Sequence, residues 1–211
     1  MHTGRILLFV VAAIVAILVG LGIGYRTFGR PGSAPKTAAL LLRPPKSLPA
    51  FSLVDDRGVP FTRASLGGHW SLLYFGYTHC TDICPATLAD LNQMAGELAD
   101  LPTAERPQVY FISLDPKRDT PALLVRYVRH FNPAFTGVTG TVADLRALTA
   151  PLGVAFSYDP PDQSGNYTVD HSSVVFLINP ANREAAIYTP PMISGRMAAD
   201  YRAIIKYYGE R

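Results

Sequence analysis

A short, almost wholly apolar run at residues 70–76 constrains the fold of this chain most strongly. Its sequence is Trp-Ser-Leu-Leu-Tyr-Phe-Gly, which is typical of a strand that is buried on both faces. Apolar residues at helical spacing follow from Ile83 to Leu98. A fully buried strand that passes into a helix indicates an α/β protein with some parallel strands.

The alternation of strand-like and helix-like segments continues toward the C-terminus. Strands are predicted at residues 109–113, 172–178 and 185–189, and helices at 120–131, 142–148 and 195–208. The sequence Asn-Pro-Ala-Asn at 179–182 is a hairpin signal between the last two strands. Strand–helix–strand–helix, a hairpin and a final helix is the order of the thioredoxin fold, so we expect a thioredoxin-like α/β domain.

An apolar segment near the N-terminus indicates a membrane anchor. Residues 6–23 carry no charge and no strongly polar group, and their 18 residues would span roughly 27–30 Å as a helix, the thickness of a bilayer core. A cleaved signal peptide usually has a shorter apolar core and a small-residue cleavage site. We predict a tail at 1–5, a transmembrane helix at 6–25, a proline-rich tether at 26–48 and the folded domain at 49–211.

Composition excludes two classes of protein. Hydrophobic residues make up 48% of the chain and charged residues 17%, which excludes a largely disordered protein. The net charge of +3 comes from the N-terminal part, because residues 1–43 hold five of the 19 Lys and Arg residues and no acidic residue. The rest carries 14 basic and 16 acidic side chains without a basic cluster, so we expect no nucleic-acid partner.

Cys80 and Cys84 are the only cysteines, and they lie between the strand at 70–76 and the helix that follows. We predict Asp82 as the N-cap of that helix, which places Cys84 and Pro85 in its first turn. A thiol there faces free backbone N–H groups and the positive end of the helix dipole. We therefore expect its pKa to fall and its thiolate to bind metal or attack disulfides. The alternative is that the two cysteines are buried apolar residues without a chemical role.

Two thiolates need a third ligand to complete a metal site, and the five histidines are the candidates. Three lie at positions typical of solvated or capping side chains, namely His2, His69 and His130. His79 is a weak candidate, because adjacent residues leaving a strand point to opposite sides and it is next to Cys80.

His171 is the stronger candidate for the third ligand. It enters a predicted strand after a long polar loop, where the thioredoxin fold usually has a cis-proline packed against the cysteines. Two soft thiolates and one imidazole suit Cu(I) and accept Cu(II), whereas structural zinc takes a fourth ligand. We predict one copper ion per chain, bound by Cys80, Cys84 and His171.

Four ordered motifs resemble the Sco/SenC family, the copper chaperones of cytochrome c oxidase assembly. They are Phe-Gly-Tyr-Thr-His-Cys-Thr-Asp-Ile-Cys-Pro at 75–85, Ile-Ser-Leu-Asp-Pro-Lys-Arg-Asp-Thr-Pro at 112–121, Gly-Val-Thr-Gly-Thr at 137–141 and Tyr-Thr-Val-Asp-His at 167–171. Thr81 departs from the pattern, because many members have proline there. The resemblance implies a membrane-anchored, thioredoxin-like domain whose copper ligands are Cys80, Cys84 and His171.

The resemblance also implies a partner and a location. The partner is cytochrome c oxidase subunit II, whose binuclear copper A centre would receive the metal, with another copper chaperone or a thioredoxin-like reductant as further partners. The location is the bacterial inner membrane with the domain in the periplasm, or the mitochondrial inner membrane facing the intermembrane space, with a single pass. A positive-inside count favours a cytoplasmic body instead, but long domains translocate largely regardless of charge.

A second functional hypothesis uses the same cysteines without a metal. Cys80 and Cys84 would reduce the cysteines of subunit II as a thiol–disulfide oxidoreductase, so whether the chain is an enzyme stays open. A disulfide between them would exclude copper, because its sulfurs are no longer thiolate ligands. A peroxidase of the peroxiredoxin type is disfavoured, because Tyr77 stands where that pattern requires proline.

Three acidic residues near the motifs have weaker assignments. Asp115 and Asp119 follow the strand at 109–113, and we expect them to shape the loop and cap the next helix, with a negative surface for partner docking as the alternative. Asp170 either supports His171 from outside the ligand set or is simply solvated. No catalytic residue is predicted.

Overall fold

The computed structural model describes residues 11–21 and 34–209, and the chain divides into two units. One unit comprises Met1–Lys36 with Lys206–Arg211, and the other is Thr37–Ile205. Within the first unit, residues 11–21 form a helix with exposed side chains, so the predicted anchor at 6–25 lies partly outside the described residues. Among the helices that the structure describes, none has both the length and the hydropathy needed to span a membrane.

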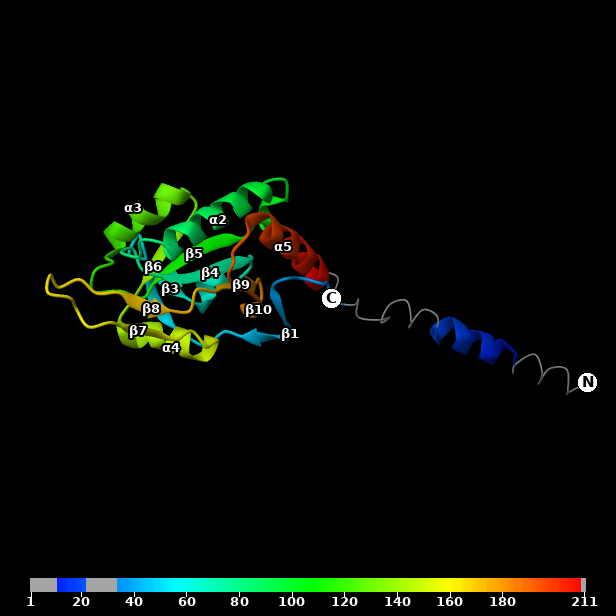
Figure 1. Ribbon diagram of the computed structural model, residues 1–211. Coiled ribbons are helices and arrows are strands. Elements are labelled where there is room, and N and C mark those ends of the chain that lie inside the picture. The colour runs from blue at the N-terminus through cyan, green and yellow to red at the C-terminus, as the bar shows by residue number, and fades with distance from the viewer. Residues whose placement is uncertain (1–10, 22–33, 210–211) are drawn as a thin grey trace, which may run out of the picture. The chain divides into compact units, whose positions relative to one another are not determined.

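A mixed eight-stranded sheet forms the centre of the larger unit (Figure 1). Its order is β1-β10-β9-β4-β5-β6-β2-β3, in which β4, β5 and β6 are parallel and β9 is antiparallel to both β4 and β10. The strands are β1 (Leu40–Ser47), β2 (Ser52–Asp55), β3 (Pro60–Thr62), β4 (Ser71–Gly76), β5 (Gln108–Ser113), β6 (Thr136–Thr139), β9 (Val175–Asn179) and β10 (Arg183–Tyr188). Every residue of β4 is buried, as the apolar run predicted.

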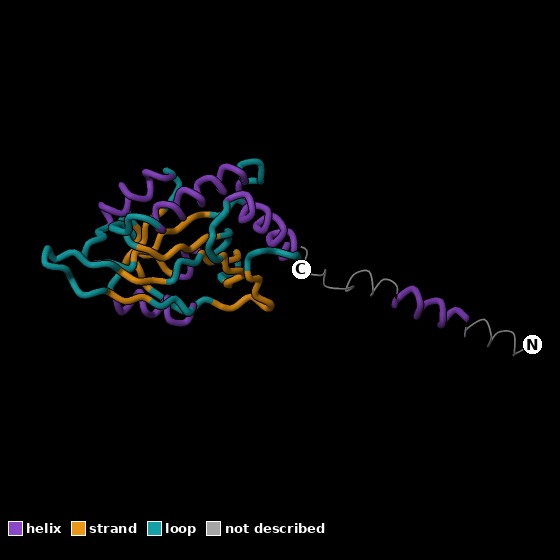
Figure 2. Tube along the Cα trace, viewed as in Figure 1, coloured by secondary structure: helices purple, strands orange, loops and turns teal. Residues whose placement is uncertain are grey.

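Helices cover both faces of this sheet, with α2 and α3 on one side and α4 on the other (Figure 1). The helices are α2 (Ile83–Glu97), α3 (Pro121–Phe131), α4 (Val142–Leu152) and α5 (Ser194–Gly209), with short 3-10 turns η1 (Arg63–Leu66) and η2 (Thr103–Glu105). A separate two-stranded sheet pairs β7 (Phe156–Tyr158) with β8 (Val169–His171) (Figure 2). The mixed α/β class and the order of the predicted elements are confirmed.

The predicted boundary between tether and domain is wrong. Residues 40–47, assigned to the tether, form β1, which pairs with β10 at the edge of the sheet. The Ala39 N–H donates to the Asp200 carboxylate at 2.8 Å, so ordered contacts begin even before this strand. The consecutive prolines Pro44 and Pro45 are tolerated because the pairing register shifts between Leu41 and Lys46, as expected for proline in an edge strand. Proline content alone therefore does not distinguish an edge strand from a tether in this segment.

Candidate metal centre

The end of β4 is shaped to receive the Cys84 side chain. A β-carbon at Gly76 would lie 2.8 Å from Cys84 Sγ and 2.8 Å from Phe111 Cε2, so only glycine allows this approach of the thiol to the strand. Cys84 is fully buried and Cys80 partly exposed, and both are free thiols. The pair therefore has one inner and one accessible sulfur.

The hydrogen bonds at the start of α2 differ from those expected for a helix capped by Asp82. Asp82 is the N-cap residue, as predicted, but its side chain makes no capping hydrogen bond. Instead the Cys84 N–H donates to Cys80 Sγ at 3.4 Å. One of the free amides at the helix start thus donates to the accessible sulfur of Cys80.

The predicted fall in the pKa of Cys84 is wrong. Burial raises the pKa of this thiol to about 12, while backbone contacts and the neighbouring Tyr74 hydroxyl oppose that rise. A helix terminus typically contributes only about 0.3–1 kcal/mol, whereas full burial can shift a pKa by about 3–5 units. Desolvation therefore dominates, and a metal ion must displace a proton to bind Cys84.

His171 reaches the cysteines from the small β7–β8 sheet. Its Nε2 lies 3.6 Å from Cys84 Sγ, although the two residues are 87 positions apart in the chain. Sequence analysis placed His171 at the entry of the predicted strand at 172–178. It belongs instead to β8, where it pairs with Phe156, and β9 begins only at Val175. The ring packs edge-on against Tyr77, with centroids 6.1 Å apart.

The environment of His171 favours a neutral ring with a free Nε2. Its Nδ1 lies 3.3 Å from the Ser172 carbonyl oxygen, which can only accept, so this contact assigns the proton to Nδ1 and leaves the Nε2 lone pair toward Cys84. Burial lowers the pKa of His171, against smaller opposing effects of the Ser172 carbonyl and the Asp170 charge. A neutral imidazole with one free nitrogen is the form that binds metal.

The separation of Cys84 and His171 fits a shared metal ion. Metal–sulfur and metal–nitrogen bonds of about 2.0–2.3 Å at trigonal or tetrahedral angles place the two ligand atoms about 3.4–3.8 Å apart. The 3.6 Å separation falls within this range. The structure thus brings together the three predicted ligand residues, and that they bind copper stays a prediction.

Asp119 connects the loop after β5 to the segment that leads into Cys80. It is fully buried and accepts hydrogen bonds from the Thr78 N–H at 2.8 Å, the Thr78 hydroxyl at 2.6 Å and the Ser113 hydroxyl at 2.5 Å. A carboxylate with three donors is well stabilised in a buried position. These contacts give Asp119 a loop-shaping role, and neither it nor Asp115 lies on the surface.

Asp115 and Arg118 connect the same loop to the segment that leads into His171. Arg118 Nε pairs with Asp115, and its Nη1 donates to the Tyr167 carbonyl oxygen at 2.9 Å. The guanidinium lies 3.6 Å from the centroid of the Tyr167 ring, and the Tyr167 hydroxyl donates to Asp115 at 2.7 Å. We call Asp115, Arg118, Asp119 and Tyr167 the brace, because they join both ligand-bearing segments.

Sequence analysis missed two members of the brace. Arg118 and Tyr167 lie within the motifs at 112–121 and 167–171, yet no role was assigned to either. Their place in those motifs was the available signal. Asp170 is exposed and alternates with His171 along β8, and its charge raises the pKa of His171 only as a minor effect against burial.

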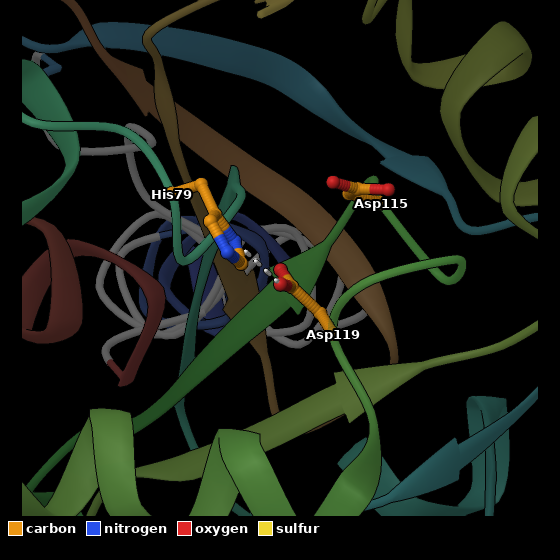
Figure 3. Close-up of side chains that lie close together, drawn as sticks. All are labelled: His79, Asp115 and Asp119. Carbon is orange, nitrogen blue, oxygen red and sulfur yellow. Dashed lines mark ion pairs between the residues drawn. The ribbon is translucent and has the colours of Figure 1, made fainter. Parts of the chain in front are cut away.

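His79, Asp115 and Asp119 form a second group of metal-ligand types, drawn in Figure 3. One ligand atom of each lies within 4.8 Å of the others. His79 Nδ1 is 3.6 Å from Asp119 and 3.1 Å from the Thr78 hydroxyl, and its side chain is half exposed. Because both carboxylates already accept hydrogen bonds from the protein, the geometry of this group is explained without an ion.

Comparison with known proteins identifies the family of this chain. The SCO1/SenC family model matches residues 42–206. The mitochondrial protein SCO2 homolog of Bos taurus is 37% identical over 172 residues, covering 79% of this chain and 65% of that protein. The chain spans about half to two thirds of the length of the curated relatives it matches.

Two solved structures extend the comparison to the fold. The crystal structure of Arabidopsis thaliana ScoI with copper bound is 31% identical, has a TM-score of 0.70 and is matched over 76% of this chain and 99% of that chain. Apo Sco1 from Thermus thermophilus is 32% identical, with a TM-score of 0.71, over 82% of this chain and 99% of that chain. The chain belongs to the SCO1/SenC family.

Proposed function

We propose that this chain is a copper metallochaperone that carries one copper ion on Cys80, Cys84 and His171. The observation that carries the proposal is the 3.6 Å separation of Cys84 Sγ and His171 Nε2, with Cys80 beside them at the helix start. Two thiolates and an imidazole are ligands that suit copper, in particular Cu(I). The Arabidopsis thaliana relative, solved with copper bound, supports the same cargo here.

The two cysteines would have different tasks in copper transfer. Cys84 and His171 form the buried side of the site, whereas Cys80 is partly exposed. An incoming thiolate from a partner would therefore replace the Cys80 sulfur first, since it is the ligand that a second protein can reach. The resemblance to the family makes subunit II of cytochrome c oxidase the proposed acceptor, at its binuclear copper A centre.

The proposed location rests on the sequence. Residues 6–25 would anchor the chain in a bacterial inner membrane or a mitochondrial inner membrane, with the folded domain in the periplasm or the intermembrane space. The segment between the anchor and β1 would act as a tether. Besides subunit II, another copper chaperone or a thioredoxin-like reductant would then act in the same compartment.

A specific contact favours thiol–disulfide exchange as a second candidate function. The accessible Cys80 sulfur accepts the Cys84 N–H, as suits an attacking thiolate. Its thiolate would attack a disulfide of subunit II and release one thiolate. The Cys84 thiol, after losing its proton, would then resolve the mixed disulfide, giving two reduced cysteines in the substrate and a Cys80–Cys84 disulfide. A thioredoxin-like dithiol would return the pair to the reduced state.

Copper stoichiometry of the full-length chain in detergent tests the proposal. Under reducing, anaerobic conditions we expect one copper per chain, lost in His171→Ala and retained in His130→Ala, a control on an exposed histidine of α3. More than one copper per chain, a preference for zinc, or equal loading of the two variants would overturn the metallochaperone proposal. If His171→Ala lost oxidase assembly but kept disulfide reduction, the second function would not account for the assembly role.

A further inference from the structure

Tyr74 carries a buried hydroxyl that interacts with the Thr87 and Cys84 side chains. The residue lies in the middle of β4 with no exposed surface, and its hydroxyl has no hydrogen-bond partner among the residues that the structure describes. Buried polar groups are nearly always hydrogen-bonded, so a fully buried orphan calls for a specific reason. The surroundings of Tyr74 indicate which group could accept a hydrogen bond from this hydroxyl.

The Tyr74 side chain shares one face of β4 with the Cys84 sulfur. Tyr74 and Gly76 are two residues apart in the strand and therefore point to the same face, and the space beside Gly76 is filled by Cys84 Sγ and the Phe111 ring. The Tyr74 ring packs on the same Phe111 ring, with centroids 6.0 Å apart. The hydroxyl, Phe111 and the inner sulfur thus belong to one buried cluster under α2.

Tyr74 and Cys84 also interact electrostatically. Burial is the largest cause of the raised pKa of Tyr74; the charge on Cys84 adds to this rise, and the Thr87 hydroxyl opposes it. Conversely, the Tyr74 hydroxyl opposes the rise that burial causes in the pKa of Cys84. The two groups are therefore close enough to interact, although the hydroxyl makes no well-formed hydrogen bond to the neutral thiol.

The protonation state of the Cys84 sulfur explains why the Tyr74 hydroxyl does not donate a hydrogen bond to it. A thiol is a weak acceptor, whereas a thiolate is charged and accepts strongly. Binding of a metal ion converts Cys84 from thiol to thiolate. We propose that Tyr74 is a positioning residue, whose hydroxyl donates a hydrogen bond to the Cys84 sulfur once that sulfur is a metal-bound thiolate; this inference rests on the proposed function.

Such a bond has two measurable consequences. It stabilises the thiolate, so it strengthens copper binding, and it draws electron density from the sulfur, so it raises the energy of the thiolate-to-Cu(II) absorption band. Hydrogen bonding around a ligating cysteine is a known means of tuning copper centres. Loss of packing alone would not move the absorption band in a defined direction.

Two tyrosine-to-phenylalanine variants of the full-length chain test the proposal. Tyr74→Phe removes the donor and keeps the ring. Tyr127→Phe is the matched control, since this tyrosine on α3 also has a buried hydroxyl without a partner in the described structure and also packs on Phe111, with centroids 5.3 Å apart. Against a chromophoric Cu(I) chelator, we expect Tyr74→Phe to lose about tenfold in affinity, in keeping with a charge-assisted hydrogen bond. Its Cu(II) band should move to longer wavelength, with both quantities nearly unchanged in Tyr127→Phe.

The outcomes separate this inference from the function on which it rests. An unchanged band and affinity in Tyr74→Phe, or equal changes in both variants, would overturn the role of Tyr74 while leaving copper binding intact. A wild-type chain that binds no copper would overturn the proposed function itself. If Tyr74→Phe does not fold, NMR of the wild-type chain tests the proposal. Cu(I) loading should move the resonance of the Tyr74 hydroxyl proton downfield. A resonance that does not move would contradict the proposal.

Discussion

The two cysteines and the histidine are held by very different kinds of structure. Cys80 and Cys84 lie at a strand–helix junction whose strand is buried along its whole length. His171 lies in a three-residue strand of a two-stranded sheet, and the segment before it is joined to the rest of the site through Arg118 and Tyr167. The cysteines should therefore keep their positions when side-chain contacts are removed, whereas His171 should depend on the brace.

The brace also makes the two regions mechanically dependent on one loop. Asp119 holds the segment before Cys80, and Asp115 with Arg118 holds Tyr167, four residues before His171. Because these side chains come from residues 115–119, a disturbance of this loop reaches both sides of the site. Variants on either side of the loop can show whether the two regions respond separately or together.

The largest effect is expected on the Cys80 side, in Asp119→Ala. This change leaves three donors, on Thr78 and Ser113, without their buried acceptor. We expect a loss of about 3–5 kcal/mol in the free energy of unfolding. Urea denaturation measures it, with Glu105→Ala, at an exposed carboxylate of η2, as a comparison for loss of charge. A loss below about 1 kcal/mol would show that the loop does not depend on this carboxylate.

A smaller loss of stability but a clear loss of metal binding is expected on the His171 side, in Arg118→Ala. The change removes the ion pair with Asp115 and the stacking on Tyr167. We expect about 1–3 kcal/mol less stability and about tenfold weaker copper binding. Arg126→Ala, at an exposed position on α3, is the matched control. Copper affinity equal to that of the control would mean that His171 does not need the brace.

Alkaline pH should weaken the fold through Cys84. Because burial raises its pKa to about 12, the native state keeps the thiol proton above pH 9 while the unfolded state loses it. Stability should fall with rising pH in this window, by about 1.4 kcal/mol per pH unit from this group. Melting curves of the reduced, metal-free chain between pH 8 and 11 measure the slope. Cys84→Ala should show a shallower slope, and equal slopes would contradict the assignment.

The smallest effect concerns His171 in mild acid. Burial lowers its pKa, so the folded chain keeps this imidazole neutral below its ordinary pKa of about 6.5, where an unfolded chain would be protonated. Falling pH through that window should therefore cost some stability, and it should add little to the loss of copper that proton competition at the thiols already causes. Calorimetry of copper binding at pH 6 and 7.5 measures how many protons the chain releases, and thus whether His171 is protonated before copper binds. A His171 imidazole that is already protonated at pH 7, and so releases a proton when copper binds, would contradict the lowered pKa.

The sequence was informative wherever a signal was local. Continuous apolar residues predicted β4, Thr120 and Pro121 predicted the start of α3, and Thr120 does accept the Leu123 N–H. The hairpin between β9 and β10 followed from Asn179 and Asn182, and Asn182 adopts a positive φ of 59°. These features depend on neighbouring residues, so they can be recognised without the fold.

The sequence was less informative wherever tertiary contacts decide the structure. The leucines of β1 gain their strand partner only from β10, which lies far away in the chain. The direction of the pKa shift at Cys84 depends on burial under α2 and beside Gly76, which outweighs the helix terminus. The brace depends on the stacking of Arg118 on Tyr167, a contact between residues 49 positions apart.

The central claim is that copper is bound jointly by both regions, through two sulfurs and one imidazole nitrogen. X-ray absorption fine structure at the copper edge of the full-length, copper-loaded chain tests it most directly. The account predicts two sulfur neighbours and one nitrogen neighbour of histidine, and the loss of the histidine signal in His171→Ala. A copper ion surrounded by oxygen and nitrogen without sulfur, or a histidine signal that survives in His171→Ala, would contradict the account.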